Sequence, residues 1–498
     1  MRRKLPKEIE YQGAYDFSPN GTREPLLDVT IGLECITPVI GGCVRAREPD
    51  TVDIVRVPGI RGQLRFWWRA LGSEPDPATL FANEMRVWGG VSGDADGAAL
   101  ASRVRVSVEK VDDQGQVFSP GIHDLKRSGN GLRPMPTWSV NQDLGYGMFP
   151  LQRNRDELTA AFREGKPNLP TWKIRKSLRF TLRLQLRAEA TGPSARDKTD
   201  DVERILWALW VWVHFGGIGG RTTRGFGALA PTANISGLPS AWTQRFTRPP
   251  SSDPTAWLRS SWQEGPMRCT APPVPVGWTH FGGSQLAVGA AIDEGAHSLL
   301  LNELRTFRQG VSWGREPSRR GKPAGQSHWP EPHMLRVRAE NAEGHTDWAH
   351  TPLPAMRKLV SPTPTSTEWI PPRAAFGLPI VVKFMDDPEL RGLDSPADAT
   401  IGLERPGGRW MSPLRLRPIA CSDGKHIPVM LLFAARPWTC AGDSITVDGK
   451  PIYLKEGTAQ PGPTGPIESD GWMARGSGDA ARAFFEWLSA NRSFWERP

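Results

Sequence analysis

Residues 57–71 read VPGIRGQLRFWWRAL, a segment that joins three arginines to three large aromatic side chains behind a Pro-Gly turn. In a helix of about 100° per residue, this segment gains one apolar face, formed by Ile60, Leu64, Trp67, Trp68 and Leu71. Beside that face, without entering it, runs a basic stripe of Arg61, Arg65 and Arg69, with Trp68 on the border. The pattern predicts a helix that buries one side and offers its guanidinium groups to a string of phosphates. The alternative is a core helix with a solvated basic flank.

Residues 216–229, GGIGGRTTRGFGAL, form a second basic segment that is rich in glycine. Glycine tolerates positive φ and lets backbone amides approach a ligand, and arginines suit phosphate oxygens. The residues expected to contact phosphates are Gly217, Gly219, Gly220, Arg221, Arg224, Gly225 and Phe226. A tight structural turn is the alternative. A dinucleotide-binding loop is disfavoured because the G-x-G-x-x-A stretch follows a helix, and no G-x-x-x-x-G-K motif occurs.

Taken together, P-x-x-R-G-x-L-R-F-W-W-R and the later G-G-I-G-x-R-x-x-R-G-F-G resemble the RAMP superfamily of CRISPR RNA-binding proteins. Within that superfamily the chain is similar to the large head-end subunit of type III-B (Cmr) effector complexes. Supporting segments are TPVIGG at 37–42, HWPEP at 328–332 with Arg336, PRAAFGLPI at 372–380 and MSPL at 411–414. Met334 and Leu335 depart from the usual pattern. The resemblance adds Gly41, Gly42 and Arg373 to the candidate RNA contacts.

Composition is compatible with this reading and does not by itself demand it. The chain has 498 residues, which favours two or three domains, and its net charge of +9 suits a polyanionic partner. Five cysteines without C-x-x-C spacing indicate reduced thiols and no zinc framework. The charged N-terminus has no apolar run behind it, and no stretch has the length of a membrane span. We therefore expect a soluble, cytoplasmic protein.

The first half of the chain is predicted to be an α+β unit. Period-two alternation predicts half-buried strands at residues 27–34, 103–108 and 178–187. Helices are expected at 57–71 and 200–215, and a final strand at 225–230. This order of elements predicts a ferredoxin-like (RRM-like) domain over residues 1–240, with helices on one sheet face and the other face open. On the polar face of the strand at 178–187, Arg179 and Arg183 are further candidate RNA contacts.

The second half is expected to repeat this fold in degenerate form, giving two ferredoxin-like domains in tandem. A connector at 241–274 contains a short helix at 256–262 and leads into the domain at 275–498. Its expected strands are 281–290, 378–384, 414–419 and 429–434, and its expected helices are 294–309 and 480–488. The repeat rests on the order of elements and on the family, since no second glycine loop occurs. Residues 119–170 are expected to be a long loop, functional or disordered, and 315–329 a basic loop.

No group of residues predicts catalysis. Some RAMP relatives are metal-independent endoribonucleases that use a histidine, and His214 directly precedes the glycine-rich segment. Its apolar neighbours in VWVHFGG favour a core histidine instead. Histidines and carboxylates elsewhere lack the spacing of metal ligands or of an acid–base pair. We therefore predict no catalytic residue, no metal and no cofactor.

The resemblance implies a non-catalytic subunit of a type III-B CRISPR ribonucleoprotein that serves antiviral defence. Such a subunit binds guide RNA near its 3′ end and helps to capture target RNA. Its implied partners are these RNAs and the other RAMP and small subunits of the complex, and not a membrane. Two alternatives stay open: a metal-independent RAMP endoribonuclease that processes CRISPR RNA, and a purely structural assembly subunit.

Overall fold

The computed structural model describes most of the chain, with gaps. The described residues are 25–42, 47–91, 99–113, 116–128, 131–140, 142–166, 168–187, 195–269, 279–309, 329, 331–332, 334–335, 338, 360–361, 363, 368–369, 371–382, 399–404, 408–434, 444–456, 480–491 and 495–496. None of the helices in these ranges is long and apolar enough to cross a membrane.

The first half builds a four-stranded antiparallel sheet in the order β12-β1-β11-β5. Its strands are β1 (Leu27–Cys35), β5 (Val104–Asp112), β11 (Arg179–Leu186) and β12 (Leu229–Ser236). Two helices complete the unit, α1 (Val57–Ala70) after β1 and α5 (Ala195–Phe215) after β11. The chain order βαββαβ, with the first strand between the third and fourth, is the ferredoxin-like arrangement. The predicted fold of this half is confirmed.

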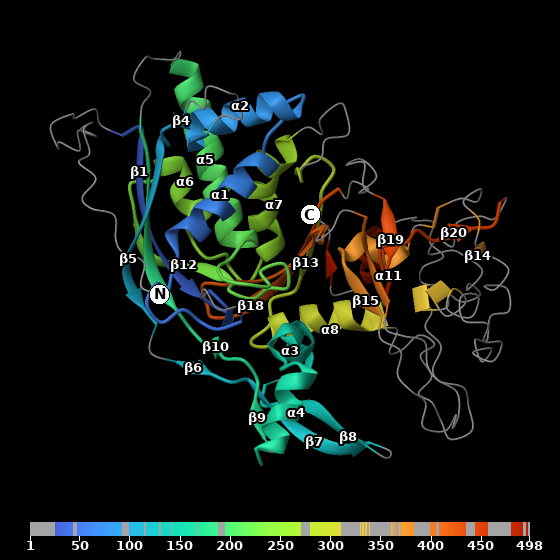
Figure 1. Ribbon diagram of the computed structural model, residues 1–498. Helices are drawn as coiled ribbons and strands as arrows, with labels where there is room; N and C mark the ends of the chain where they lie inside the picture. The colour runs from blue at the N-terminus through green and yellow to red at the C-terminus, as the bar shows by residue number, and fades with distance from the viewer. Residues whose placement is uncertain are drawn as a thin grey trace, which may run out of the picture.

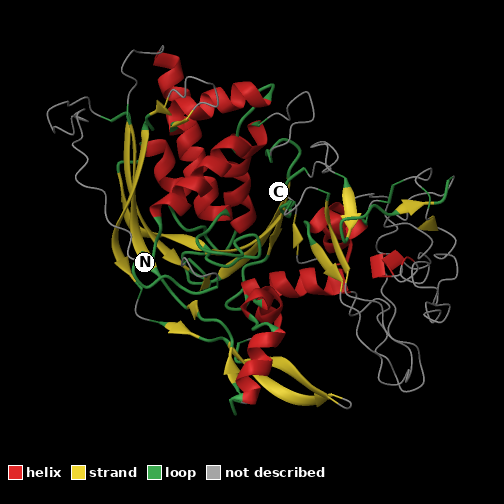
Figure 2. Cartoon of the chain, viewed as in Figure 1, coloured by secondary structure: helices red, strands yellow, loops and turns green. Residues whose placement is uncertain are grey.

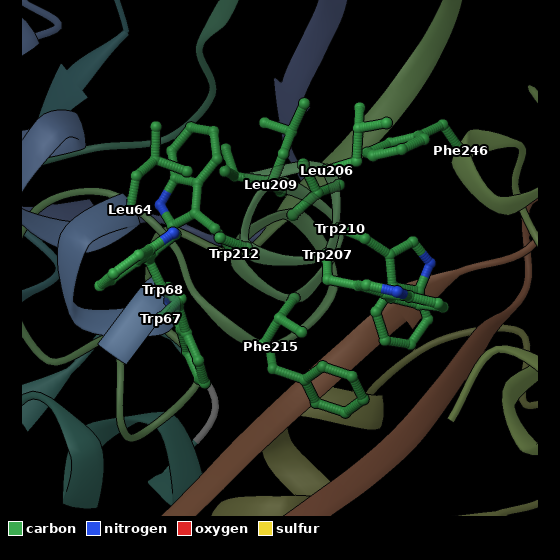
Figure 3. Packing of buried hydrophobic residues seen from close by; sticks show 14 of the residues in the cluster. Leu64, Trp67, Trp68, Leu206, Trp207, Leu209, Trp210, Trp212, Phe215 and Phe246 are labelled. Atoms are coloured by element: carbon green, nitrogen blue, oxygen red, sulfur yellow. The ribbon is translucent and has the colours of Figure 1, made fainter. Parts of the chain in front are cut away.

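Helices α1 and α5 cover one face of this sheet with a core rich in tryptophan. Alternate residues of β11 are buried, as the sequence pattern predicted. Above them, Trp67 and Trp68 of α1 and Trp210 and Trp212 of α5 are almost completely buried. Figure 3 shows Trp67 and Trp68 beside Trp212. The apolar face expected for α1 is therefore its buried face, and it includes Trp68.

The second half repeats the arrangement with a sheet in the order β17-β18-β13-β21. Its strands are β13 (Gln285–Gly289), β17 (Leu414–Ala420), β18 (His426–Leu432) and β21 (Trp495–Glu496). Helix α8 (Ala296–Gln309) follows β13, and α11 (Ala480–Asn491) precedes β21. Strand order and helix positions match those of the first sheet, so the expectation of two ferredoxin-like units in tandem is confirmed.

The second sheet is buried on both faces. Leu286 and Val288 of β13 belong to the core of the first unit, whereas Ala287 belongs to the core beneath α8 and α11. The molecule therefore stacks sheet, helices, sheet and helices, with the helices of the first unit between the two sheets (Figures 1 and 2). Within the described part of the chain, no helix covers the outer face of the first sheet, as predicted.

Besides the shared core, a buried arginine joins the second sheet to the first unit. Arg417 of β17 donates from Nε to His214 O (2.9 Å) and from Nη1 to Gly216 O (2.8 Å). Its Nη2 donates to Val213 O (2.6 Å) and Leu229 O (2.8 Å). The carbonyls at the end of a helix lack partners within the helix, and its C-terminal dipole attracts cations. Arg417 thus caps the C-terminus of α5 from the other half of the chain.

The expected loop at 119–170 is instead a structured insertion, so that prediction is wrong. It contains β7 (Gly121–Ser128), β8 (Gly131–Trp138), α3 (Gln142–Gly147), η1 (Phe149–Leu151), α4 (Arg155–Arg163) and β9 (Leu169–Pro170). Strands β7 and β8 form a hairpin that projects beyond the body of the molecule (Figure 1), while α3 packs on α8. Hydrophobic spacing missed the hairpin because the apolar residues of β7 and β8 do not alternate with polar ones.

Short elements connect the main ones. In the first half they are β2 (Val39–Ile40), α2 (Pro77–Trp88), β3 (Gly90–Val91), β4 (Ala99–Leu100), β6 (Val117–Phe118) and β10 (Ile174–Arg175). Between the halves lie α6 (Ser240–Thr243), η2 (Gln244–Phe246), α7 (Pro254–Glu264) and η3 (Pro266–Arg268). Helix α7 confirms the helix predicted in the connector.

The second half also carries a small separate sheet, β15-β16-β19. Its strands are β15 (Ile380–Val382), β16 (Ala399–Leu403) and β19 (Ile445–Val447), and nearby lie β14 (Val360–Ser361), η5 (Pro372–Phe376) and β20 (Tyr453–Leu454). The strand expected at 225–230 begins only at Leu229, because the glycine loop extends to that point. Of the basic loop at 315–329, only Trp329 lies within the described residues.

Candidate nucleic-acid interface

The arginine stripe of α1 faces helix α2 rather than open solvent. Arg65 Nε lies 2.7 Å and Arg69 Nη1 2.5 Å from Oε1 of Glu84, a carboxylate that is almost fully buried. Arg61 donates to the carbonyl oxygen of Trp88. The expectation that these arginines run beside the buried face without holding a buried charge is wrong. One carboxylate of α2, Glu84, binds both Arg65 and Arg69, and Arg61 binds main-chain carbonyl oxygens.

Trp68 also turns inward. It is 1% exposed, and the guanidinium carbon of Arg204 lies 3.5 Å above its ring centre. The indole is therefore buried, with Arg204 covering one ring face, and it is not accessible for a base to stack on. Among the candidates on α1, the three arginines Arg61, Arg65 and Arg69 are partly exposed, and Trp68 is not.

The glycine loop 216–227 is mostly a buried turn. The backbone N–H groups of six of its residues donate to main-chain carbonyl oxygens: Gly216, Ile218, Gly220, Arg224, Gly225 and Gly227. A Cβ at Gly217 would meet Gly227 O at 2.6 Å, and one at Gly225 would meet His297 at 2.9 Å. Phe226 is fully buried with its ring edge-on to that histidine. For this part of the loop the geometry favours the structural-turn alternative, with backbone packed too closely for any side chain.

The tip of the loop remains at the surface and meets a second glycine pair. Gly219 and Gly220 lie against β2, where Gly220 N donates to Ile40 O (2.7 Å). Directly after β2, Gly41 and Gly42 have φ of 69° and 114°, and a Cβ at Gly41 would meet nothing within 4 Å. We call Gly41, Gly42, Gly219 and Gly220 the glycine patch. It is a partly exposed stretch of bare backbone built from two segments that the sequence separates widely.

Arginines at the base of the glycine patch carry charge that no carboxylate balances. Arg224 is 7% exposed, and its Nη1 has no hydrogen-bond partner among the described residues. Burial, together with the neighbouring Arg308 and Arg221, lowers the pKa of Arg224 to about 9. Arg221 donates from Nε to Gly147 O (3.0 Å), and Arg308 donates to the hydroxyl of Tyr146 (3.3 Å). Among the described residues, no ion pair reaches any of these three guanidinium groups.

The outer face of the first sheet carries Arg179 and Arg183 as predicted, but each has an acidic partner. Arg183 makes a two-pronged contact with Asp28 (2.9 and 2.7 Å), which lowers the pKa of that carboxyl group. Arg179 and Arg248 both bind Glu34 at the rim of a groove of about 850 Å³ on this face. The groove is basic because the cationic side chains that line it outnumber its one acidic residue, Glu34. Its charges are thus more nearly balanced than those beside the glycine patch.

Arg373, at the start of η5, is held by a buried acid. Its backbone N–H and Nε donate to the two carboxylate oxygens of Glu331 (2.6 and 3.1 Å), which is completely buried. The guanidinium also lies 5.9 Å from the ring centre of Trp329. This contact joins the WPEP and PRAAF segments that supported the family resemblance. The structure therefore places Arg373 in a packing contact of the second half.

No catalytic constellation occurs in the described part of the chain. No three His, Cys, Asp or Glu residues there are placed to hold a metal ion. Burial and then the charge of Arg417 lower the pKa of His214 to about 3, and this histidine is only 1% exposed. Cys35, Cys269 and Cys421 are free thiols whose pKa values burial raises. His214 is a neutral core histidine at physiological pH, which does not suit acid–base catalysis on an external substrate.

Two buried histidines predict sensitivity to mild acid. Burial lowers the pKa of His214 to about 3 and that of His297 to about 4, whereas an unfolded histidine titrates near 6.5. Below pH 6.5 the unfolded state therefore binds protons that the native state excludes. Stability is fully present above that pH and is lost as the pH falls toward 4. By pH 5 each histidine should remove roughly 2 kcal/mol.

Urea unfolding of the whole chain at pH 7 and pH 5 measures this loss. In the His297→Asn variant the difference between the two pH values should shrink by roughly 2 kcal/mol. Carboxylates with lowered pKa values, such as Glu74 and Asp201, reduce stability only when the pH approaches 4. They therefore contribute little to the difference between pH 7 and pH 5. An unchanged pH dependence in the variant would show that His297 is not buried as a neutral group.

The sequence did not point to the insertion as a part of this surface. Gly147 at the end of α3 accepts the hydrogen bond from Arg221, and Phe149 follows two residues later with its side chain 62% exposed. Arg153 stacks on Trp172 with 3.7 Å between the guanidinium carbon and the ring centre. Arg47 reaches the same segment through Gln152 O (3.4 Å). In the sequence, the only local signal of this turn is that two apolar residues, Met148 and Leu151, stand three positions apart. Both are buried in the structure.

Comparison with known proteins finds a family model that matches part of the first half of the chain. Residues 32–230 match the model of the RAMP superfamily. No curated protein matches. The apo crystal structure of Cmr1 from Pyrococcus furiosus is 16% identical, with a TM-score of 0.34, over 85% of this chain and 99% of that one. Two chains from cryo-EM structures of type III-B Cmr-beta bound to cognate target RNA are 13% and 12% identical, with TM-scores of 0.43 and 0.40. Each alignment covers 94% of this chain and 99% of the other.

Proposed function

We propose that this chain, whose residues 32–230 form a RAMP-superfamily domain, is a non-catalytic RNA-binding subunit of a type III-B CRISPR (Cmr) effector complex. In this role it binds guide RNA near the 3′ end and helps to capture target RNA in the cytoplasm. Its other partners are the RAMP and small subunits of the same complex. The family match and the ordered set of segments resembling the large head-end subunit support this assignment.

The observation that carries the proposal is the unbalanced charge beside the glycine patch. Among the described residues, Arg224 is buried with no hydrogen-bond partner for its Nη1, and the neighbouring charges that lower its pKa besides burial are those of Arg308, Arg221 and Arg415. A buried charge without a counter-charge costs several kcal/mol, and a chain of phosphates supplies the missing counter-charge. The exposed backbone at Gly41 and Gly42 lets a sugar–phosphate strand approach more closely than side chains would permit. Together these features suit an RNA backbone.

This form of recognition is independent of base sequence. A guide RNA varies from one complex to the next while the protein stays the same, so contacts belong on phosphates and base faces. The candidate surface offers guanidinium groups and bare backbone, and it displays no paired amide side chains for reading base edges. We therefore assign the principal RNA contact to the glycine patch, Arg221 and Arg224, with the outer sheet face as a second, weaker surface.

RNA binding by the isolated chain should depend strongly on salt and little on sequence. About five phosphate contacts would give a slope of log affinity against log salt of roughly −3 to −4. Fluorescence anisotropy with labelled single-stranded RNA, titrated at several NaCl concentrations, measures this slope. Arg221→Asn should weaken binding and reduce the slope by about 0.7. Asparagine suits this position because Arg221 has φ of 63°, which few other side chains tolerate.

The matched control is Lys166→Gln, which removes one exposed positive charge at the end of α4. It should leave both affinity and slope nearly unchanged. Equal effects of the two substitutions would mean that only net charge matters and would argue against a site. Affinity that does not change with salt in the unmodified chain would refute RNA binding and favour the structural assembly role.

The endoribonuclease alternative predicts that bound RNA is cleaved, whereas the proposed function predicts that it stays intact. Because His214 is buried and neutral, the RNA recovered from the binding reaction should be intact, with or without divalent metal. Gel analysis of the recovered RNA checks this. Specific cleavage that disappears in His214→Ala would place the chain among the processing nucleases.

A further inference from the structure

Phe149 is an exposed aromatic side chain in a segment that is otherwise well anchored. It opens the single turn η1, in which Met148 and Leu151 are completely buried. Residues three apart lie on the same side of a 3₁₀ turn, so burying these two directs Phe149 outward. The turn is held by hydrogen bonds from Leu151 N to Met148 O (2.8 Å) and from Trp172 N to Leu151 O (2.9 Å). The ring is thus presented to solvent from a fixed backbone.

The surroundings of Phe149 are cationic. Gly147, two residues earlier, accepts a hydrogen bond from Arg221 at the base of the glycine patch. Two consecutive residues span at most about 7 Å between Cα atoms, so the backbone of Phe149 lies near the carbonyl that receives this hydrogen bond. On the other side, Arg47 contacts Gln152 O, and Arg153 covers Trp172. Isolated exposed apolar side chains are ordinary, but a patch built for a protein partner gathers several of them. The charged residues that contact the segment around Phe149 are arginines, which favours an anionic partner.

We propose that Phe149 is a stacking platform for one unpaired nucleobase of the RNA strand whose backbone lies on the glycine patch. This inference rests on the proposed RNA-binding function and adds a base subsite to it. Bases have an apolar face that any aromatic ring can cover, and their phosphates need cations within a few ångströms. An exposed ring on the segment whose Gly147 carbonyl binds Arg221 offers both at once. Stacking of this kind does not read sequence, as a variable guide requires.

The test uses the full chain and single-stranded RNA carrying 2-aminopurine, a base whose fluorescence is quenched by stacking. One position of the oligonucleotide is labelled at a time. Binding to the unmodified chain should quench one label strongly. Phe149→Ala should abolish that quenching and weaken affinity by about 5- to 100-fold, whereas Phe149→Trp should retain both. Because the side chain is exposed, neither substitution should change the melting temperature.

Two controls separate the possible outcomes. Phe162→Ala removes another exposed phenylalanine, 43% exposed on α4 of the same insertion, and should leave quenching and affinity intact. Normal quenching and affinity in Phe149→Ala would overturn the stacking subsite while RNA binding itself stands. Loss of association with other complex subunits in Phe149→Ala, with normal RNA affinity, would assign the ring to a protein contact and also overturn it. Failure of the unmodified chain to bind RNA is seen in the first titration and refutes the proposed function instead.

Discussion

Arg417→Met should lower the free energy of unfolding by at least about 4 kcal/mol. The arginine donates to four carbonyl oxygens, three of them at the C-terminus of α5 and one at Leu229. Methionine fills a similar volume but leaves these acceptors buried without a donor, and each orphaned polar group costs about 1–3 kcal/mol. The effect crosses between the two ferredoxin-like units, so a single unfolding transition should move to lower urea concentration.

Arg415→Met supplies the matched comparison. Arg415 lies two residues earlier on β17 and is as deeply buried, but its only hydrogen bond among the described residues goes to the sulfur of Met411 (3.4 Å). Its Nε has no partner, and burial lowers its pKa to about 10. The guanidinium carbon lies 5.1 Å from the ring centre of Phe66 and 5.5 Å from that of Trp67, but it has no carboxylate partner among the described residues. Replacing such a buried charge by an apolar side chain of similar volume is often neutral or stabilising. Urea unfolding should therefore show a large loss for Arg417→Met and none for Arg415→Met. Similar losses for both would mean that volume, and not hydrogen bonding, sets the effect.

The double variant Arg65→Met and Arg69→Met should lose about 3–5 kcal/mol of stability. Both guanidinium groups bind the same buried oxygen of Glu84, and removing them strands that carboxylate in the protein interior. Adding Glu84→Met to the double variant should restore most of the loss, because no unpaired charge then remains. Thermal or urea unfolding of the double and triple variants measures the difference.

The result separates two descriptions of helix α1. A double variant that unfolds like the unmodified chain but binds RNA poorly would show that the arginine stripe is a free surface, as its sequence pattern suggested. Recovery in the triple variant, with RNA binding unaffected throughout, would show that the stripe serves to fasten α2 to α1. The geometry supports the second description.

The order of elements was readable from the sequence, whereas the pairing of charges was not. Alternation in residues 27–34 and 178–187 depends on one buried face, a local property of each strand, and both strands form as predicted. The partner of Arg65 lies 19 residues away on a helix that the pattern did not reveal. The sequence pattern of a basic stripe is the same whether its arginines contact water, phosphate or a buried carboxylate. Helical periodicity therefore predicted the helix and the position of its basic stripe, but not the buried carboxylate that the stripe binds.

The glycine-rich segment was ambiguous for a similar reason. Positive φ is needed both for a tight buried turn and for an exposed ligand-binding loop, and both uses occur within a few residues. Gly217, Gly219 and Gly225 all leave no room for a Cβ, whereas a Cβ at Gly41 would meet nothing within 4 Å. The juxtaposition with Gly41 and Gly42 follows from the pairing of Gly220 with Ile40, a contact between distant segments. Such contacts become visible only in the folded chain.

The sheet with two buried faces has a consequence for synthesis. When α5 leaves the ribosome, Trp67 and Phe215 have not yet met Phe281, Val288 or Phe433, which later share their core. Translation proceeds at about 5–20 residues per second, so roughly 10–40 s pass before β18 emerges. During that interval the nascent N-terminal half displays an aromatic surface with nothing to cover it. Chaperone binding during elongation should therefore peak after α5 is made and decline once β18 is complete.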